Sequence, residues 1–336
     1  MLFRSIAPHG VLIVFASGQA EPFDPAGHLH AGFRLEKNGG PVILTASDGV
    51  TTVDTVSYPA LDIDLAYGRD LEGNWTFIEP TPGAVNAAPT YPGWLRELEW
   101  SHARGFYETG FTLTLTNPNP DSTVYYSRDG SEPTLPYLNG IPIARTTAIR
   151  IRADRPGYRP ARIQTKTFLF LDDVIASPVM NPAITQDPAY APRMRPGLLA
   201  LPSVSICVPG GPEYEEKEGS LEILWPGDGN PVQVNCGISR FGNAWTKYDK
   251  RSIRMKCRAR YGAAKLDVPL FNGFDRGVLA RASFDELDFR SGSQDMYERG
   301  FYMAGRFVED TMLDMGRLNP HGRFVHIYIN GVYWGQ

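Results

Sequence analysis

Cationic side chains recur at every second position of SIRMKCRARYG, the stretch from residue 252 to residue 262. Because the side chains of a strand alternate between its two faces, a strand here would carry four cations on one face and an apolar row on the other. The four cations are Arg254, Lys256, Arg258 and Arg260. Neighbours on one strand face lie about 6.5–7 Å apart, so these charges repel one another unless anions lie among them.

Two sources of anions fit this pattern. The first is the protein itself, because Glu286 and Asp288 would share a strand face in FDELDFR and could pair with the cations across two strands. The second is a bound polyphosphate, since arginine and lysine are the usual phosphate-binding residues. Both sources remain open at this point, and Arg254 and Lys256 are the candidates for binding a phosphate.

A second candidate for anion binding follows in LDFRSGSQD. Arg290 stands at the end of a predicted strand and Asp295 at the start of a predicted helix, with a Gly-Ser turn between them. The backbone amides of a helix N-terminus bind anions, and the guanidinium of Arg290 could add positive charge there. The alternative is that Asp295 caps the helix and Arg290 pairs with it. Arg290 and Asp295 therefore join Arg254 and Lys256 as predicted cofactor-binding residues.

The sequence contains none of the motifs that mark well-known catalytic sites. G-x-G-x-x-G, V-A-I-K, H-R-D and D-F-G, which are typical of ordinary protein kinases, are absent, and so are G-x-S-x-G and H-E-x-x-H. His28 and His30 form an H-x-H pair, but no third ligand is near in the sequence, so packing is the preferred interpretation. No catalytic residue and no metal ligand is predicted.

The composition of the 336 residues indicates β-rich modules joined by turns, with 34 Gly, 28 Pro, 17 Phe, 16 Tyr and 6 Trp. A net charge of -4 gives no indication of a nucleic-acid partner or of an anionic membrane. No segment approaches the roughly 20 apolar residues that cross a bilayer. Cys207, Cys236 and Cys257 fit no zinc motif, and three buried thiols are preferred over one disulfide and a free thiol.

Residues 1–86 are predicted to form short strands. The runs VLIVFAS, FRLEK, PVILTAS and TTVDTVSYP are rich in strand-forming residues, and Asp48-Gly49 makes a tight turn between the last two. The stretches GVLIVFASG, LHAGFRLEKNGGPVILTASDG, VDTVSYP and PTPGAVN resemble the lamin-tail domain. That resemblance implies a small immunoglobulin-like sandwich that lacks its first strands here.

Residues 94–170 are predicted to form a second β module. FTLTLTN and TTAIRIRAD alternate apolar and polar residues, as half-buried strands do, and Asp129-Gly130 turns the chain. YYSRDGSEPT, IPIARTTAIRIRA and GYRPARIQTKTF are similar to the immunoglobulin-like C-terminal domain of chitobiase and hexosaminidase enzymes. The resemblance implies a module that accompanies other domains and carries no catalytic residues.

Residues 171–200 contain five prolines and show little periodicity, which predicts a proline-rich linker or a wrapping segment. Residues 201–336 are predicted to form an α+β domain with strands at VSICV, LEILW, VQVNCGI, SIRMKCRA, LDVPLF and ELDFR. One helix is expected from Asp295 to Met315, since Asp295 and Glu298 form a capping-box pattern and Gly316 supplies a stop. Its apolar face would consist of Met303, Ala304, Phe307, Val308, Met312 and Met315.

Four stretches of this last region resemble the kinase-like domain of the spore coat protein H family. They are KRSIRMKCRARYGAAKLDVPLF, FDELDFRSGSQD, YERGFYMAGRFVEDTMLDMG and GRFVHIYINGVYWGQ. The resemblance implies transfer of the γ-phosphate of ATP to serine or threonine hydroxyls, with ATP and Mg2+ as cofactors. In that family the acidic residues that hold the metal are expected after NGVYWGQ, where this sequence ends.

The last residues also predict a hairpin, because Asn330-Gly331 suits a type I′ turn between two alternating runs. Its return strand has barely begun when the sequence ends at Gln336. We therefore expect a piece of a longer protein, cut inside its first domain and inside its kinase-like domain. The expected fold class is two all-β immunoglobulin-like sandwiches followed by an incomplete α+β kinase-like domain.

The expected function follows from these resemblances. The complete protein would be a bacterial surface or exported protein with ATP-dependent Ser/Thr kinase activity, and the fragment by itself would be inactive. The alternative is a non-catalytic cell-surface protein whose β modules bind polysaccharide or protein partners. The acceptor substrate is not indicated by the sequence.

Overall fold

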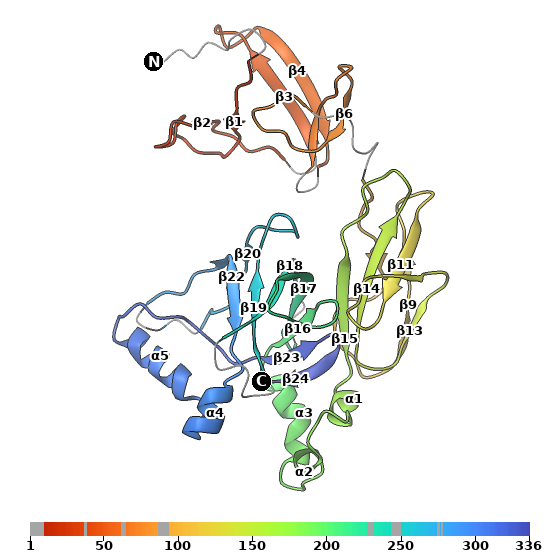
Figure 1. The fold of residues 1–336 in the computed structure, drawn as a ribbon, viewed down its shortest axis with the longest axis vertical. Helices are drawn as coiled ribbons and strands as arrows, with labels where there is room; N and C mark the ends of the chain where they lie inside the picture. The colour runs from red at the N-terminus through yellow and green to blue at the C-terminus, as the bar shows by residue number, and fades with distance from the viewer. Residues whose placement is uncertain are drawn as a thin grey trace. The chain divides into compact units, whose positions relative to one another are not determined.

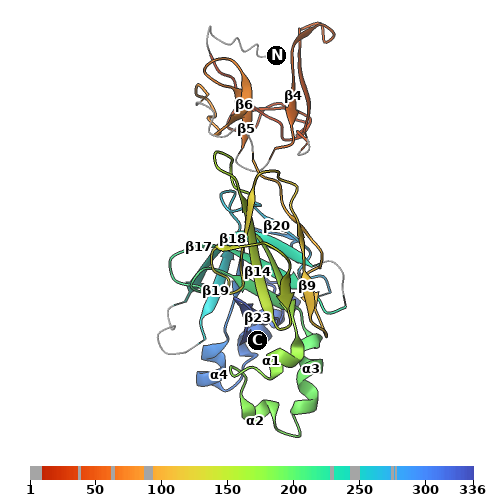
Figure 2. The same cartoon turned by 90° about the vertical axis from the view of Figure 1, so that its right-hand side faces the viewer.

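The computed structural model describes residues 10–36, 39–61, 65–86, 94–227, 231–242, 250–273, 276 and 278–336, except the side chains of Gln294, Tyr297 and Arg299. Strands prevail among these residues, and the helices lie within residues 171–200 and 293–314 (Figure 1, Figure 2). The chain divides into two compact units. The first runs to Trp94 and includes Gly157–Arg159, and the second contains Leu95–Pro156 and Pro160–Gln336.

The first unit contains three two-stranded sheets among its described residues. They pair β1 (Val14–Phe15) with β2 (Leu29–His30), β3 (Gly39–Thr45) with β4 (Thr52–Pro59), and β5 (Ala66–Arg69) with β6 (Trp75–Ile78). The predicted turn at Asp48-Gly49 is confirmed, because Gly49 has φ 72° and Asp48 Oδ1 accepts from the amides of Val50 and Thr51. In the described part of FRLEK, Arg34 makes only an isolated bridge, to Ser17, so the predicted strand is not formed there.

The predicted second β module is built from nine strands of the second unit. One sheet has the order β12-β11-β14-β15-β8, and the pairs β9–β13 and β7–β10 lie outside it. The bounds are β7 (Glu99–Trp100), β8 (Gly105–Phe106), β9 (Phe111–Leu113), β10 (Leu115–Thr116), β11 (Thr123–Ser127), β12 (Leu135–Pro136), β13 (Ile141–Ile143), β14 (Thr147–Asp154) and β15 (Gln164–Leu169). The run FTLTLTN is split between β9 and β10, which pair with different partners, while the core of the module contains Leu113, Ile149 and Phe168.

The proline-rich segment 171–200 forms three short helices: α1 (Leu171–Ile175), α2 (Pro182–Thr185) and α3 (Ala191–Ala200). A proline at the first helical position is tolerated because that amide has no partner within the helix, and Pro182 begins α2 in this way. Leu171, Val174 and Leu198 are buried in a cluster with Leu224 and Tyr328. The segment therefore packs on the body of the second unit, which agrees with the wrapping segment and not with the linker of the two predicted alternatives.

The C-terminal part of the second unit contains a seven-stranded sheet in the order β22-β19-β18-β17-β16-β23-β24. The strands are β16 (Ser203–Cys207), β17 (Lys217–Leu224), β18 (Val232–Phe241), β19 (Ser252–Lys256), β22 (Glu286–Phe289), β23 (His326–Ile329) and β24 (Val332–Gly335). Neighbours run antiparallel except β16 and β23, which are parallel. β20 (Leu266–Asp267) and β21 (Ser283–Phe284) form a separate pair. Each of the six predicted strands of this region overlaps one of these elements.

The two faces of this sheet differ in chemistry. One face buries an apolar cluster that includes Val204, Ile223, Met255 and Ile327. The other face carries Ser205, Ser220 and Glu222, which meet the side chains of Thr165 and Thr167 from β15. This polar face therefore packs on the sheet of the second β module, and the two parts form one compact unit.

Glu222 is the charged centre of that contact and has no exposed surface. Its Oε1 lies 3.0 Å from Arg104 Nε and accepts from the amide of Thr167, and its Oε2 accepts from the Thr167 hydroxyl. Burial raises the pKa of Glu222, and the charge of Arg104 opposes that shift. A buried carboxylate is tolerated because each oxygen has partners.

The single helix predicted from Asp295 to Met315 is wrong, because the structure has two: α4 (Ser293–Arg299) and α5 (Ala304–Asp314). Gly300, with φ 62°, ends the first of them. The predicted stop at Gly316 is confirmed, since this residue has φ 73° and its amide donates to Leu313 O while the amide of Arg317 donates to Met312 O.

The predicted apolar face of this region is not buried. Phe307 is 65% exposed, Val308 58% and Met315 67%, whereas the buried residue of α5 is Leu313. The face that α5 turns inward carries Arg306, and that side chain forms ion pairs described below. The charged face of α5, which carries Arg306 and Glu309, therefore packs on the rest of the second unit.

The C-terminal hairpin is confirmed. Asn330 and Gly331 have φ values of 51° and 81°, as a type I′ turn requires, and β24 pairs with β23 with one irregularity between Ile327 and Tyr328. The Asn330 side chain also ties the turn to the end of β16. Its Oδ1 accepts from the Val208 amide at 2.9 Å, and its Nδ2 donates to Val208 O at 2.9 Å.

Replacing Glu222 by alanine tests the buried polar contact. Glu222→Ala leaves the Arg104 guanidinium without its buried carboxylate, and we expect a loss of about 3–5 kcal/mol in the free energy of unfolding. Urea unfolding followed by circular dichroism measures this. Glu108→Ala is the control, because Glu108 pairs with Arg195 at 2.8 Å but is 71% exposed, and it should change stability far less. Equal losses in the two variants would contradict the importance of the buried pair.

Two glycine-to-alanine variants, at Gly130 and at Gly211, together test the packing of the turn at Asn330. A Cβ at Gly130, which has φ 75°, would overlap the Asn330 amide, whereas a Cβ at Gly211, with φ 81°, would meet no atom within 4 Å. Both alanine variants carry the left-handed backbone penalty of about 1–2 kcal/mol. Gly130→Ala should lose about 1–3 kcal/mol more. Chemical unfolding of both variants checks this, and equal stabilities would contradict it.

Candidate functional site

Two of the predicted cofactor-binding residues, Arg254 and Lys256, lie on β19 and face carboxylates of β22. Arg254 is opposite Asp288 and Lys256 is opposite Glu286. Arg254 Nε and Nη2 donate to Asp288 Oδ1 and Oδ2 at 2.7 and 2.8 Å, and Lys256 Nζ lies 3.6 Å from Glu286 Oε2. The hydrogen bond to Asp288 raises the pKa of Arg254. Of the two anion sources considered, the protein itself supplies the anions here.

The predicted row of four cations on one strand is wrong, because β19 ends at Lys256. Arg258 and Arg260 lie beyond its end and both bind Glu216, with Arg258 Nε at 2.6 Å and Arg260 Nη2 at 2.7 Å from Glu216 Oε1. The Arg258 hydrogen bond is the largest cause that lowers the pKa of Glu216, to about 2. All four cations of the motif therefore have carboxylate partners.

Arg290 and Asp295, the other two predicted residues, come together. Arg290 Nη2 lies 3.6 Å from Asp295 Oδ2, and the Asp295 side chain is 6% exposed. The expected N-cap at Asp295 is wrong, because α4 begins two residues earlier, at Ser293, after Gly292 with φ 64° and with no side-chain cap. Asp295 is thus a buried partner of Arg290 in the first turn of the helix.

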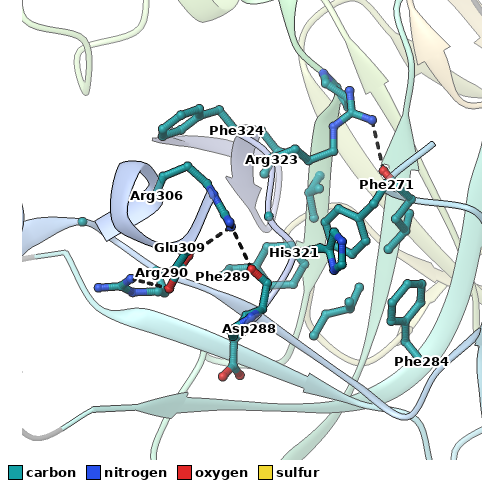
Figure 3. A pocket seen from close by; sticks show the side chains of 18 of the residues that line it. Phe271, Phe284, Asp288, Phe289, Arg290, Arg306, Glu309, His321, Arg323 and Phe324 are labelled. Atoms are coloured by element: carbon teal, nitrogen blue, oxygen red, sulfur yellow. Dashed lines mark hydrogen bonds and ion pairs between the residues drawn. The ribbon is translucent and has the colours of Figure 1, made fainter. Parts of the chain in front are cut away.

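A pocket of about 760 Å³ is lined by residues of β22, α4, α5 and residues 318–325. Its lining includes Arg290 and Asp295 but neither Arg254 nor Lys256. Side chains alternate across a strand, so Arg254 and its opposite residue Asp288 share the polar face of the sheet, while Phe289 faces the pocket with the apolar cluster. In Figure 3 the Asp288 carboxylate points away from Arg306 and Phe324. The sheet therefore separates the four predicted residues into two pairs.

Aromatic side chains form one part of the pocket wall. Phe271, Phe284 and Phe289 line it, with the Phe271 and Phe284 rings 5.7 Å apart in an edge-on arrangement (Figure 3). His321 lies beside Phe271, with ring centroids 6.1 Å apart, and its Nε2 is 2.8 Å from Val278 O. This part of the pocket suits the flat apolar part of a ligand.

Charged side chains form the opposite part, around Glu309 of α5. Glu309 Oε1 lies 3.4 Å from Arg290 Nη1, and its Oε2 lies 3.0 Å from Arg306 Nη1 (Figure 3). Arg306 is 15% exposed and also holds Asp310 at 2.7 Å and Pro320 O at 3.0 Å. Arg290, by contrast, is 55% exposed, and its contacts are longer: 3.6 Å to Asp295 and 3.4 Å to Glu309.

Arg306 and Glu309 were missed by the sequence analysis, although a signal for them existed. Residues three apart on a helix are neighbours, so an Arg-x-x-Glu pair predicts an ion pair on the helix surface. The apolar face that the pattern predicts lies on the other side of the helix. What the sequence could not supply is the proximity of Arg290, which lies 19 residues before Glu309.

The described residues do not form a metal site. No group of three or more His, Cys, Asp or Glu side chains among them could hold a metal ion. The H-x-H pair is explained by local contacts, since His28 Nδ1 lies 2.8 Å from Asp24 Oδ2 and Ser17 Oγ lies 2.9 Å from His30 Nδ1. The hydrogen bond with His28 is the largest cause that lowers the pKa of Asp24.

The three cysteines are free and buried, as predicted. Burial raises the pKa of Cys207 to about 12 and that of Cys257 to about 11, and it raises the pKa of Cys236 as well. The thiol, not the reactive thiolate, is therefore the stable form at neutral pH.

Comparison with known proteins identifies one part of the chain. Residues 102–165 match the family described as chitobiase/beta-hexosaminidase C-terminal domain, so the predicted resemblance of the second β module is confirmed over that range. No curated protein and no solved structure matches the chain. None of the helices in the described ranges is long and apolar enough to cross a membrane.

The acid dependence of stability tests the Glu216 cluster. Its depressed pKa means that Glu216 stabilises the folded state above its ordinary pKa of 4.5, and that this contribution is lost as the pH falls toward about 2. Glu216→Gln should therefore be less stable than wild type at pH 7, and the difference should shrink between pH 4.5 and 2. Urea unfolding at a series of pH values measures this. A difference that does not vary with pH would contradict the assignment.

Proposed function

We propose that the pocket beside β22 binds a nucleoside phosphate, and that the C-terminal part of the chain is the nucleotide-binding portion of a phosphoryl-transfer domain. The observation that carries this proposal is the pairing of an aromatic wall with the exposed guanidinium of Arg290 in one pocket. The resemblance to the spore coat protein H family names ATP as the nucleotide.

The chemistry of the two walls suits the two ends of such a ligand. Aromatic rings pack on a flat purine by offset or edge-on contacts, and a guanidinium holds phosphate oxygens through two parallel hydrogen bonds. A volume of about 760 Å³ is within the range of small-molecule sites. Arg290 rather than Arg254 is the favoured phosphate-binding residue, because Arg254 already makes a two-pronged contact with Asp288.

Mg2+ does not fit the residues that the structure describes. Phosphoryl transfer needs carboxylates or an asparagine to hold the metal against the phosphates. Among the described carboxylates of the pocket, Glu286, Asp288, Asp295 and Glu309 each face a cation of the protein. The proposal for these residues is therefore binding of the nucleotide, and no catalytic base is assigned.

The wider setting is part of the same proposal. The resemblances to a lamin-tail domain and to the spore coat protein H family favour a bacterial surface or exported protein whose complete form phosphorylates Ser or Thr hydroxyls. The match of residues 102–165 supports a multi-domain architecture of this kind. Within it, the matched module would support the C-terminal sheet through the contact at Glu222.

Isothermal titration of the chain with ATP, with and without Mg2+, tests the proposal. Wild type should bind, and Arg290→Ala should weaken the affinity about tenfold to a hundredfold, the value of a charged hydrogen-bonding group. Arg254→Ala and Lys256→Ala are the matched controls on the other face of the sheet, and each should stay within about twofold of wild type. Absence of ATP binding by wild type at millimolar concentration, or equal losses in all three variants, would overturn the proposal.

A non-catalytic surface protein that binds polysaccharide or protein partners is the second candidate. The observation that favours it is the match of residues 102–165 to a domain named after enzymes that act on chitin fragments. Titration with chitin oligosaccharides in place of ATP separates the two functions. Saccharide binding without nucleotide binding would favour this candidate.

A further inference from the structure

The ion pairs of Arg290 set up a competition within the pocket. Arg290 lies between two carboxylates, with Asp295 at 3.6 Å and Glu309 at 3.4 Å, and more than half of its side chain is exposed. The pair with Glu309 is long and partly exposed, with 25% of the Glu309 side chain accessible, and ion pairs of this kind contribute little to stability. Arg290 can therefore change partners at small cost.

The two carboxylates differ in how far they can move. Asp295 is buried, and the backbone of Gly305 packs closely against the Arg290–Asp295 pair, so that a Cβ at Gly305 would approach both side chains to 2.9 Å. Glu309 is less enclosed, with 25% of its side chain exposed. Asp295 is thus a fixed partner of Arg290 and Glu309 a releasable one.

Glu309 also has a second partner that would retain it. Arg306 Nη1 lies 3.0 Å from Glu309 Oε2, closer than Arg290. Arg306 in turn is fixed by Asp310 and by the carbonyl of Pro320. When Arg290 is withdrawn, Glu309 keeps its charge compensated by Arg306, so the exchange leaves no buried charge alone.

We propose that Glu309 occupies Arg290 in the absence of ligand and is exchanged there for a phosphate group of the bound nucleotide. This inference rests on the function proposed above and identifies the residue that limits the affinity of the pocket for anions. The exchange replaces one ion pair of Arg290 by another, and no covalent bond changes. Repulsion between the Glu309 carboxylate and an incoming phosphate adds to the competition.

Neutralising Glu309 tests the exchange. Glu309→Gln keeps the shape of the side chain, removes its charge, and should tighten the binding of both ATP and inorganic pyrophosphate about fivefold to tenfold, measured by isothermal titration. Glu286→Gln is the matched control: it also neutralises a carboxylate of β22 beside the pocket, but that carboxylate pairs with Arg254 and Lys256 on the other face of the sheet, and its effect should stay below about twofold. Glu309→Ala is a second variant with the same expected direction, and thermal unfolding shows that each variant is folded.

A double-mutant cycle locates the effect at Arg290. In the Arg290→Ala background, Glu309→Gln should tighten ATP binding by less than about twofold, because the group for which the carboxylate competes is gone and only the relief of the direct repulsion remains. Wild-type binding of ATP with no tightening by Glu309→Gln would overturn the exchange and leave the proposed function standing. Tighter pyrophosphate binding without ATP binding would support the exchange and refute the nucleotide. Binding of neither ligand by any variant would overturn both.

Discussion

The buried carboxylate of Glu222 is the interaction on which the second unit depends. It lies at the centre of the contact between β15 and β17, held by Arg104 and by the amide and hydroxyl of Thr167. A polar contact of this kind is stable only when every group has a partner. Because one face of the C-terminal sheet is used in this way, the other face remains for the apolar cluster and for the pocket that adjoins it.

The pocket then follows from the edge of that sheet. β22 is an edge strand of the sheet, and its Phe289 lines the pocket while its two carboxylates compensate the cations of β19 on the far side. Directly after the strand, Arg290 reaches α4 and α5. β22 thus lies between two sets of charges. The ion pairs with β19 on one face are complete, whereas Arg290, at the end of the strand, can exchange its partners.

The sequence predicted the features that depend on local pattern. The period of two in β19 and β22 was sufficient to predict that Arg254 and Lys256 could pair with Asp288 and Glu286, and Asn330-Gly331 predicted the hairpin. The features that it did not predict depend on tertiary contacts. The helix breaks at Gly300, which adopts a φ of 62°. Arg306 points inward, where it binds the carbonyl of Pro320, and its helix neighbour Glu309 meets Arg290, 19 residues earlier. For the same reason, no pattern could show that the sheet divides the four candidate residues, since that depends on which face packs on the second β module.

The parallel pairing of β16 with β23 affects how the chain folds during translation. Val208, directly after β16, is bound by Asn330, 122 residues later. β23 pairs with β16 from Ser203 to Ile206. During translation the hydrogen-bonding edge of β16 therefore stays open until the hairpin has left the ribosome, although β17 and β18 can already pair. An unpaired strand edge is a template for association with other chains. Slow translation or a shortage of chaperones during this interval should favour aggregation of the nascent chain over native folding.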